Sequence, residues 1–280
     1  MATMENDNKR VDRAWNRLHS RLEQDGLLER KAEPQQPIFR PAALRWAASI
    51  VILITASIFI LHEMKTTQPE MFTLLNSEKN STFVTTLEDG SVVYLAENTS
   101  LSYPEHFQKS SREVFLEGDA FFDISKNPES PFIIETDIIK VKVLGTSFNV
   151  KTANKEYSSL SVNTGVVEVT LKNGGKSTRI KAGETVLIQS GSLQVIPTQD
   201  FEQFTRYMSR MHFKDERLAD IISVVNRNFK DMIFEVSPDI EERLLTATFS
   251  QDSPDSIVQL ICSALNLKYS QQQNRIKIYK

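Results

Sequence analysis

The side chains that could perform chemistry in this chain of 280 residues are four histidines and one cysteine. The histidines stand at positions 19, 62, 106 and 212, without the short ligand spacings of a zinc site. Gly145-Thr-Ser-Phe-Asn149 lacks the second glycine of a nucleophile elbow, and neither a phosphate-binding loop nor a dinucleotide fingerprint occurs. Cys262 follows Ile261 and is more typical of a small core residue than of a nucleophile. We therefore expect no catalytic residue, metal site or cofactor, and we do not expect an enzyme.

The composition is that of an ordinary folded protein, with 40% hydrophobic and 25% charged residues. A formal net charge of -3 argues against a generally basic nucleic-acid binder, so we expect no direct nucleic-acid partner. A single cysteine excludes an internal disulfide. The length allows two folded domains, or one domain with appendages.

One segment departs from this average. Residues 46–61 read WAASIVILITASIFIL without a charge, and residues 42–44 extend the apolar stretch across Arg45. Twenty helical residues rise about 30 Å, which matches the hydrocarbon core of a bilayer. A buried core helix would usually carry polar residues along one face. We therefore expect a transmembrane helix at 42–62.

The flanking cations predict the orientation of this span. Arg or Lys stands at 30, 31, 40 and 45 on its N-terminal side, but only at 65 and 79 on the other side. Because Lys and Arg near a span favour the cytoplasm, we expect a cytoplasmic N-terminus and a single pass through the inner membrane. The C-terminal domains then lie across the membrane, which in a Gram-negative bacterium means the periplasm.

A helical pattern occupies the first 41 residues. One aromatic and three aliphatic residues recur at intervals of four, three and four, and thus share one helix face: Val11, Trp15, Leu18 and Leu22. Such a helix could lie on the membrane surface, or it could fold against another protein with Trp15 as the anchor. Gly26 would end the helix. Pro34, Pro37 and Pro41 then predict an extended tether.

Residues 72–197 are typical of an all-β domain. Short segments rich in Val, Ile, Phe and Thr alternate with glycines, and Val166–Leu171 alternates apolar with polar residues. Asp89-Gly90 and Asn173-Gly174 predict hairpins with type I′ turns. We expect a β-sandwich or a related mainly-β fold.

The last 75 residues, 206–280, predict a separate α+β domain with its own core. One helical stripe starts after Asp215, a potential N-cap, and a second follows Ser253-Pro254. With the strand-like runs around them they give the order β-α-β-β-α-β-β. The expected strands are Arg210–Phe213, Met232–Val236, Leu245–Phe249, Leu267–Ser270 and Arg275–Tyr279.

Specific strings in the β region support a family resemblance. They are Thr86-Leu-Glu-Asp-Gly-Ser-Val-Val-Tyr-Leu95, Ser100-Leu-Ser-Tyr-Pro104, Arg112-Glu-Val-Phe-Leu-Glu-Gly-Asp-Ala-Phe-Phe-Asp-Ile124, Pro131-Phe132, Val143-Leu-Gly-Thr-Ser-Phe-Asn-Val150 and Ala182-Gly-Glu184. Over about 120 residues the chain resembles the FecR family of transmembrane anti-sigma factors. It departs from the family at Glu88, where Pro is common, and at Asp119, where Glu is common.

Turns and close contacts account for most of these motif residues. We expect structural roles for Asp89, Gly90, Ser91, Gly118, Phe122, Gly145, Thr146, Phe148 and Gly183.

The resemblance implies a regulator with two partners. The arm of residues 1–41 would bind an extracytoplasmic-function sigma factor through the stripe around Trp15. The C-terminal domain is similar to the short N-terminal domain of secretins and TonB-dependent receptors, and it would sense the N-terminal signalling domain of a TonB-dependent transporter. Docking by strand addition at the last strand would involve Arg275, Lys277 and Tyr279, although Lys on an edge discourages pairing. The exposed faces of the two helices are the competing docking surface.

A different class of function also fits the sequence. The chain could be a membrane-tethered periplasmic module that binds a glycan or an envelope protein, with the short arm serving only as an anchor. The two hypotheses differ in whether residues 1–30 are needed for function.

Overall fold

The computed structural model describes residues 2–27, 50–59, 70–77, 79, 81–152, 157–229 and 231–280. The chain divides into two compact units, Met1–Thr67 and Gln68–Lys280. Each unit is described by itself.

The first unit contains the amphipathic helix α1 (Ala2–Gln24). Its C-terminal end is closed by two hydrogen bonds, from the Leu27 N–H to the Leu22 carbonyl at 3.0 Å and from the Gly26 N–H to the Glu23 carbonyl at 3.4 Å. Gly26 has φ +67°, the left-handed conformation that this type of helix end requires. The expected helix and its end at Gly26 are therefore confirmed.

A second helical segment in this unit covers residues 50–59. Within it the Thr55 hydroxyl donates to the Val51 carbonyl at 2.9 Å. In the described part of the chain, no helix is both long enough and apolar enough to cross a membrane. Of the span expected at 42–62, residues 42–49 and 60–62 lie outside the described residues.

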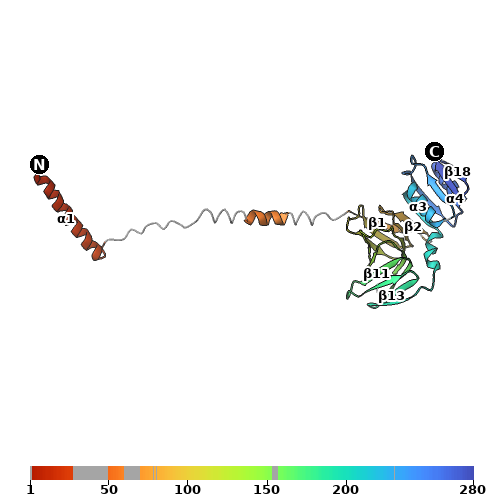
Figure 1. Cartoon of the computed structure of the whole chain (residues 1–280), viewed down its shortest axis with the longest axis horizontal. Coiled ribbons are helices and arrows are strands. Elements are labelled where there is room, and N and C mark those ends of the chain that lie inside the picture. Colours follow the sequence, from red (N-terminus) through yellow and green to blue (C-terminus); the bar gives the residue numbers. More distant parts are fainter. Residues whose placement is uncertain are drawn as a thin grey trace. The chain divides into compact units, whose positions relative to one another are not determined.

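The second unit is built mainly of β-strands (Figure 1). Its first sheet has seven strands in the order β1-β4-β5-β7-β8-β11-β12. These are β1 (Met71–Asn76), β4 (Thr99–Pro104), β5 (Arg112–Glu117), β7 (Phe132–Glu135), β8 (Ile139–Val143), β11 (Val166–Leu171) and β12 (Ser177–Lys181).

The second sheet has nine strands in the order β14-β13-β10-β9-β6-β3-β2-β15-β17. These are β2 (Thr82–Thr86), β3 (Val92–Leu95), β6 (Ala120–Asp123), β9 (Ser147–Thr152), β10 (Tyr157–Thr164), β13 (Glu184–Gln189), β14 (Ser192–Pro197), β15 (Met211–Arg217) and β17 (Leu244–Phe249).

A hydrophobic core lies between the first sheet and the β2–β14 part of the second. Alternate residues of strands from both sheets meet there, including Leu116 and Val169 from one sheet and Phe122, Phe148 and Val186 from the other. The alternation in β11 leaves Val167, Val169 and Leu171 buried, as the pattern predicted. A β-sandwich over the central part of the chain is thus confirmed.

The two expected hairpins form, but the expected turn type is wrong. The β2–β3 and β11–β12 connections each have one or more glycines at positive φ, whereas neither Asp89 nor Asn173 adopts a positive φ. A type I′ turn needs both central residues in that region. In the first loop the Gly90 N–H instead donates to the Leu87 carbonyl at 2.9 Å.

The C-terminal module follows a connector that contains two short 3₁₀ helices, η1 (Glu202–Phe204) and η2 (Arg206–Met208). After β15 come α3 (Leu218–Asn228), β16 (Ile233–Val236), β17, α4 (Pro254–Leu265), β18 (Lys268–Gln272) and β19 (Arg275–Tyr279). This confirms the expected order of elements. β16, β19 and β18 form a three-stranded sheet with β19 in the middle. Helix α3 contacts β15 and β16, and α4 contacts β17, β18 and β19, so each helix lies against the nine-stranded and the three-stranded sheet.

The starts of the two helices show one correct and one wrong prediction. Ser253 caps α4, since its hydroxyl accepts from the Ser256 N–H at 3.2 Å and Pro254 follows at the first position. Asp215 does not cap α3, which starts after Arg217 without a side-chain cap. Asp215 lies inside β15 at an irregularity in its pairing with β17. There its main-chain N–H donates to the Thr246 hydroxyl, and its carboxylate accepts from the same hydroxyl.

The C-terminal module has a core separate from that of the sandwich, as expected, but residues of the sandwich contribute to it. Val84, Val92, Tyr94 and Phe121 of β2, β3 and β6 belong to the same buried cluster as the side chains of α3 and α4. These strands are therefore covered on both faces, by the sandwich core on one side and by the module on the other. We call this contact region the seam.

Candidate functional site

Three surfaces could carry function in the described residues: the apolar face of α1, the C-terminal module, and the seam that joins the module to the sandwich. None of them is a catalytic constellation. In the described ranges no three His, Cys, Asp or Glu side chains lie close enough to hold a metal ion.

The predicted stripe on α1 is exposed. Trp15 is 66% exposed and Val11 64%, while Leu18 is 47% exposed and Leu22 is half-buried. Large apolar side chains at this exposure on one helix face are typical of a surface that another molecule covers. The structure thus places all four predicted residues on one accessible face.

The motif residue Asp89 organises the β2–β3 turn. Its carboxylate accepts from the Ser91 N–H at 3.0 Å and from the Ser91 hydroxyl at 2.7 Å, and it also pairs with the Arg112 guanidinium. Arg112 is 3% exposed and donates from Nε to the Ser130 carbonyl at 2.9 Å. Its guanidinium lies 5.4 Å from the centre of the Phe132 ring. A buried charge is costly unless it is paired and hydrogen-bonded, and the partners of Arg112 join three segments of the sandwich: the β2–β3 turn, β5 and the start of β7.

The remaining motif residues also have structural surroundings. The Phe122 and Phe148 rings stack 5.4 Å apart in the sandwich core. Gly118 packs against Thr99, and a Cβ at this position would lie 2.6 Å from the Thr99 hydroxyl oxygen. Gly145 and Thr146 connect β8 to β9, and Gly183 lies in the turn before β13. The sandwich motifs therefore position strands and do not converge on one site.

Main-chain pairing forms the first part of the seam. β15 pairs with β2 in parallel over two residue pairs, Met211 with Thr82 and His212 with Phe83. The Thr82 N–H donates to the Arg210 carbonyl at 2.9 Å. The nine-stranded sheet is therefore continuous from the sandwich into the C-terminal module.

Two charged side chains of the module complete the seam. Beyond the irregularity in β15, a Glu216 carboxylate oxygen accepts from the Thr86 N–H of β2 at 2.9 Å. Arg227 of α3 pairs with the Asp123 carboxylate of β6 and donates to the Gly90 carbonyl at 2.8 Å. Both side chains thus bond groups of the sandwich that are more than a hundred residues away in the chain.

Burial changes the titration of Glu216. Desolvation raises its pKa to about 7, an effect that the hydrogen bond from Thr86 opposes and the nearby Asp220 carboxylate reinforces. At neutral pH this carboxyl is close to its midpoint of ionisation. The seam therefore contains a group whose charge changes in the neutral range.

An aromatic contact joins the connector to the sandwich. The Tyr207 ring stacks on Phe121 with centres 6.1 Å apart, and its hydroxyl donates to the Asn149 side-chain oxygen at 2.8 Å. Burial raises the pKa of Tyr207 above its ordinary value. The seam is thus apolar at its centre and hydrogen-bonded at its margins.

Sequence reasoning missed the seam, although part of its signal was present. Val92–Leu95 and Ala120–Phe122 are continuous apolar runs, and such runs are typical of strands that are buried on both faces. No comparable signal marks Glu216 or Arg227, because a charged residue next to an apolar stripe is usually solvated.

The expectation that the last strand is a free edge is wrong. β19 pairs with β16 on one side and β18 on the other, so its main-chain groups are already bonded. Arg275 and Lys277 remain exposed on its outer face and Tyr279 is half-buried. Their contact with a receptor stays a prediction, but strand addition at β19 is excluded.

The edge strands of this sheet are β16 and β18. Among the described strands β18 pairs only with β19, and all five of its residues are exposed. A hollow lies between it and α4, lined on the helix by Gln259, Cys262 and Ser263 and on the strand by Lys268 and Tyr269. An exposed strand edge beside a helix is an arrangement that can accept an extended peptide strand.

Two family models match this part of the chain. The model of the FecR protein matches residues 73–194, and that of the FecR C-terminal region matches residues 210–278. The chain belongs to the FecR family. The boundary between the two matches falls in the connector, so the FecR and FecR C-terminal regions are the two sides of the seam.

Two crystal structures, at 2.50 and 1.65 Å resolution, are similar to this FecR chain. Both are of a candidate anti-sigma factor from Parabacteroides distasonis, at 26% identity, and each comparison covers 75% of this chain and 99% of the other. The TM-scores are 0.45 and 0.43. No curated protein matches the chain.

Proposed function

We propose that this FecR protein is a single-pass inner-membrane anti-sigma factor. It would bind an extracytoplasmic-function sigma factor in the cytoplasm through α1 and respond to a TonB-dependent transporter in the periplasm. Membership of the FecR family is the observation that carries this proposal.

The exposed stripe of α1 supports a protein partner at the N-terminal end. A helix that presents Val11, Trp15 and Leu18 on one face can fold into an apolar groove, with Trp15 as the anchor residue. The arginines on its other faces would stay in water or meet acidic groups at the rim of the groove.

The apolar run of residues 46–61 supports the membrane part of the proposal. The excess of Lys and Arg before the run favours a cytoplasmic N-terminus. In this arrangement residues 1–41 form the sigma-binding arm, residues 42–62 the span, and residues 72–197 and 206–280 the periplasmic regions.

The free edge of β18 supports a receptor-docking role for the C-terminal module. A strand of the transporter's signalling domain could extend the three-stranded sheet at β18, and main-chain hydrogen bonds would supply affinity. To transmit a signal, the transporter must present two states that bind this module unequally.

Co-purification from cells provides the decisive test. The full chain is expected to retain an extracytoplasmic-function sigma factor from its own genome, whereas a chain without residues 1–30 loses it. The same deletion should deregulate a reporter gene that depends on this sigma factor. If neither the full chain nor the deleted chain retains a sigma factor, and the deletion leaves the reporter unchanged, α1 is only an anchor and the protein is a tethered periplasmic binding module.

A reporter fused after Lys280 tests the topology separately. An enzyme that is active only in the periplasm should be active in this fusion. An inactive but intact fusion would contradict the orientation inferred from the flanking cations.

A further inference from the structure

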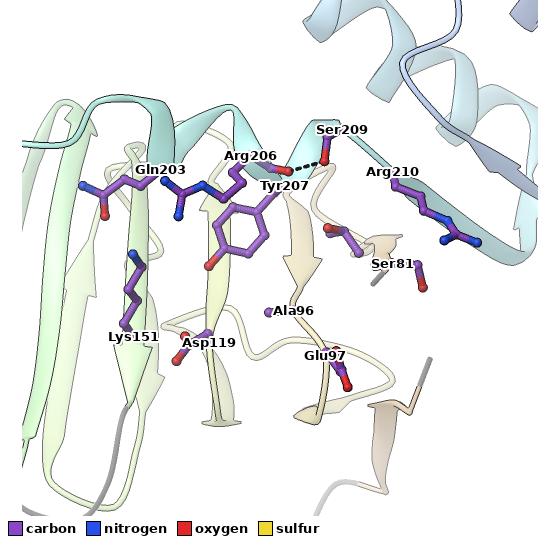
Figure 2. Close-up of a pocket in the computed structure, with 11 residues that line it drawn as sticks. Ser81, Ala96, Glu97, Asp119, Lys151, Gln203, Arg206, Tyr207, Ser209 and Arg210 are labelled. Atoms are coloured by element: carbon purple, nitrogen blue, oxygen red, sulfur yellow. Dashed lines mark hydrogen bonds between the residues drawn. The ribbon is translucent and has the colours of Figure 1, made fainter. Parts of the chain in front are cut away.

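A cleft lies at the seam, where the connector crosses the ends of β9, β6, β3 and β2 (Figure 2). Its volume is about 490 Å³, within the range of small-molecule sites. Lys151 and Asp119 stand on the sandwich side, and Gln203, Arg206 and Tyr207 stand on the connector side. Nothing in the proposed function uses this cleft.

Two cations converge in the cleft from its opposite walls. In Figure 2 the Lys151 ammonium and the Arg206 guanidinium point toward the same end of the cleft, whereas Arg210 extends away at the other end. The Arg206 guanidinium also forms an exposed ion pair with the Asp200 carboxylate, at 2.9 Å. Within the described residues, Lys151 forms neither an ion pair nor a side-chain hydrogen bond.

The other polar groups around these cations already have partners in the protein. Asp119 Oδ1 accepts from the Thr152 N–H at 2.7 Å. Gln203 Oε1 accepts from the Asn149 side-chain amide at 3.2 Å, and Asn149 also accepts from the buried Tyr207 hydroxyl. The floor of the cleft is therefore held in place. Asp119 and Glu97 also line the cleft, but among the described residues no carboxylate lies within ion-pair distance of the Lys151 ammonium.

We propose that this cleft binds a small ligand through an anionic group, a carboxylate or a phosphate, held between Lys151 and Arg206. A charge-assisted hydrogen bond from each side would fix this group, and the Tyr207 side chain would border the rest of the ligand. The anion can come from a free small molecule or from the C-terminal carboxylate of a peptide, which have the same chemistry at this point.

Such a ligand would bridge the sandwich and the connector. Because Lys151 belongs to β9 and Arg206 to η2, an anion between them adds a contact across the seam. A ligand that binds only the folded state also raises its stability by mass action. Binding should therefore be visible both as heat of association and as a higher unfolding temperature.

Titration calorimetry on the purified full chain tests the proposal with four probes: succinate, inorganic phosphate, an acetylated tripeptide with a free C-terminus, and the same tripeptide as an amide. At least one of the three anionic probes should bind and the amide should not. Binding of succinate or phosphate would indicate a small-molecule ligand. Binding of the free-acid tripeptide alone would indicate a peptide terminus.

Lys151→Gln is the matched variant, because among the described residues this side chain has no hydrogen-bond or ion-pair partner to lose. We expect it to weaken binding about tenfold or more, the loss of one charge-assisted hydrogen bond. Lys176→Gln, in the exposed β11–β12 turn, should leave binding unchanged. Absence of binding by every anionic probe at about 10 mM, or equal binding by wild type and a folded Lys151→Gln, would overturn the proposal.

Discussion

The guanidinium of Arg227 in α3 is paired with the carboxylate of Asp123 in β6. One residue belongs to the C-terminal module and the other to the sandwich, and both side chains are about one-third exposed. Together with the bond from Arg227 to the Gly90 carbonyl, this pair ties α3 to the β2–β3 turn that the family motif shapes. A movement of the module would therefore reach the sandwich through a defined contact.

Arg227→Ala should destabilise the folded protein by about 2 kcal/mol, because it leaves the Asp123 carboxylate and the Gly90 carbonyl without their donor. Calorimetric unfolding of the full chain measures the change. Arg275→Ala removes the exposed pair with Glu235 and should change the free energy of unfolding by less than about 0.5 kcal/mol. Equal losses in the two variants would show that the Arg227 contact does not hold the seam.

Glu216 should make the stability of the seam depend on pH. Burial raises its pKa from 4.5 to about 7, so the folded state binds the proton more tightly than the unfolded state does. Its contribution to stability is then fully present below about pH 4.5 and is lost as the pH rises through about 7. The groups that influence its charge are Asp220, Arg217 and the Thr86 N–H, and Tyr103 interacts with it electrostatically.

Glu216→Gln removes this titration and keeps an oxygen that can accept from the Thr86 N–H. The variant should be more stable than wild type at pH 8, and its unfolding temperature should rise less on acidification to pH 5.5. Glu129→Gln, at an exposed position, serves as the control and should follow wild type. If Glu216→Gln shows the wild-type pH profile, the carboxyl is not the titrating group.

The sequence predicted the elements that depend on local periodicity and turn chemistry. The alternation of Val166–Leu171, the two helical stripes and the Ser253 cap each follow from neighbouring residues alone, and the structure has all of them. The free edge of the C-terminal sheet was wrongly predicted at the last strand, because the order of strands in a sheet depends on pairing between distant segments. β19 is last in the chain but central in its sheet.

The seam could not be derived in the same way. Its apolar part is visible in the sequence as the continuous apolar run Val92–Leu95. The same run is also explained by a strand in the core of the sandwich alone, so it does not reveal the second contact. Its charged part has no local signal, because Glu216 and Arg227 find their partners Thr86 and Asp123 more than a hundred positions away in the chain. The cleft beside Lys151 likewise exists only once the connector crosses the sheet.

Gly118→Ala should destabilise the sandwich by about 2–4 kcal/mol, since it combines an unfavourable φ of +106° with overpacking against Thr99. Gly174→Ala is the matched control. Its φ of +99° is similar, but a Cβ there meets no atom within 4 Å, so only the backbone cost of about 1–2 kcal/mol applies. The difference between the destabilisations of the two variants measures the cost of the contact with Thr99. Equal destabilisations would contradict the close approach of Gly118 to Thr99.

In the complex with a sigma factor that we propose, Trp15→Ala should weaken binding about 30-fold or more, which corresponds to about 2 kcal/mol for a buried aromatic anchor. The reason is that Trp15 is the largest side chain of the exposed stripe on α1. Ser20→Ala lies on the opposite face of the same helix, where the hydroxyl donates to the Asn16 carbonyl, and it should leave the affinity within about twofold. Affinities are measured by titration of the full chain with the purified sigma factor, with helix content checked by circular dichroism. If both variants bind like wild type, the partner does not use the apolar face of α1, and the membrane surface becomes the better explanation for that face.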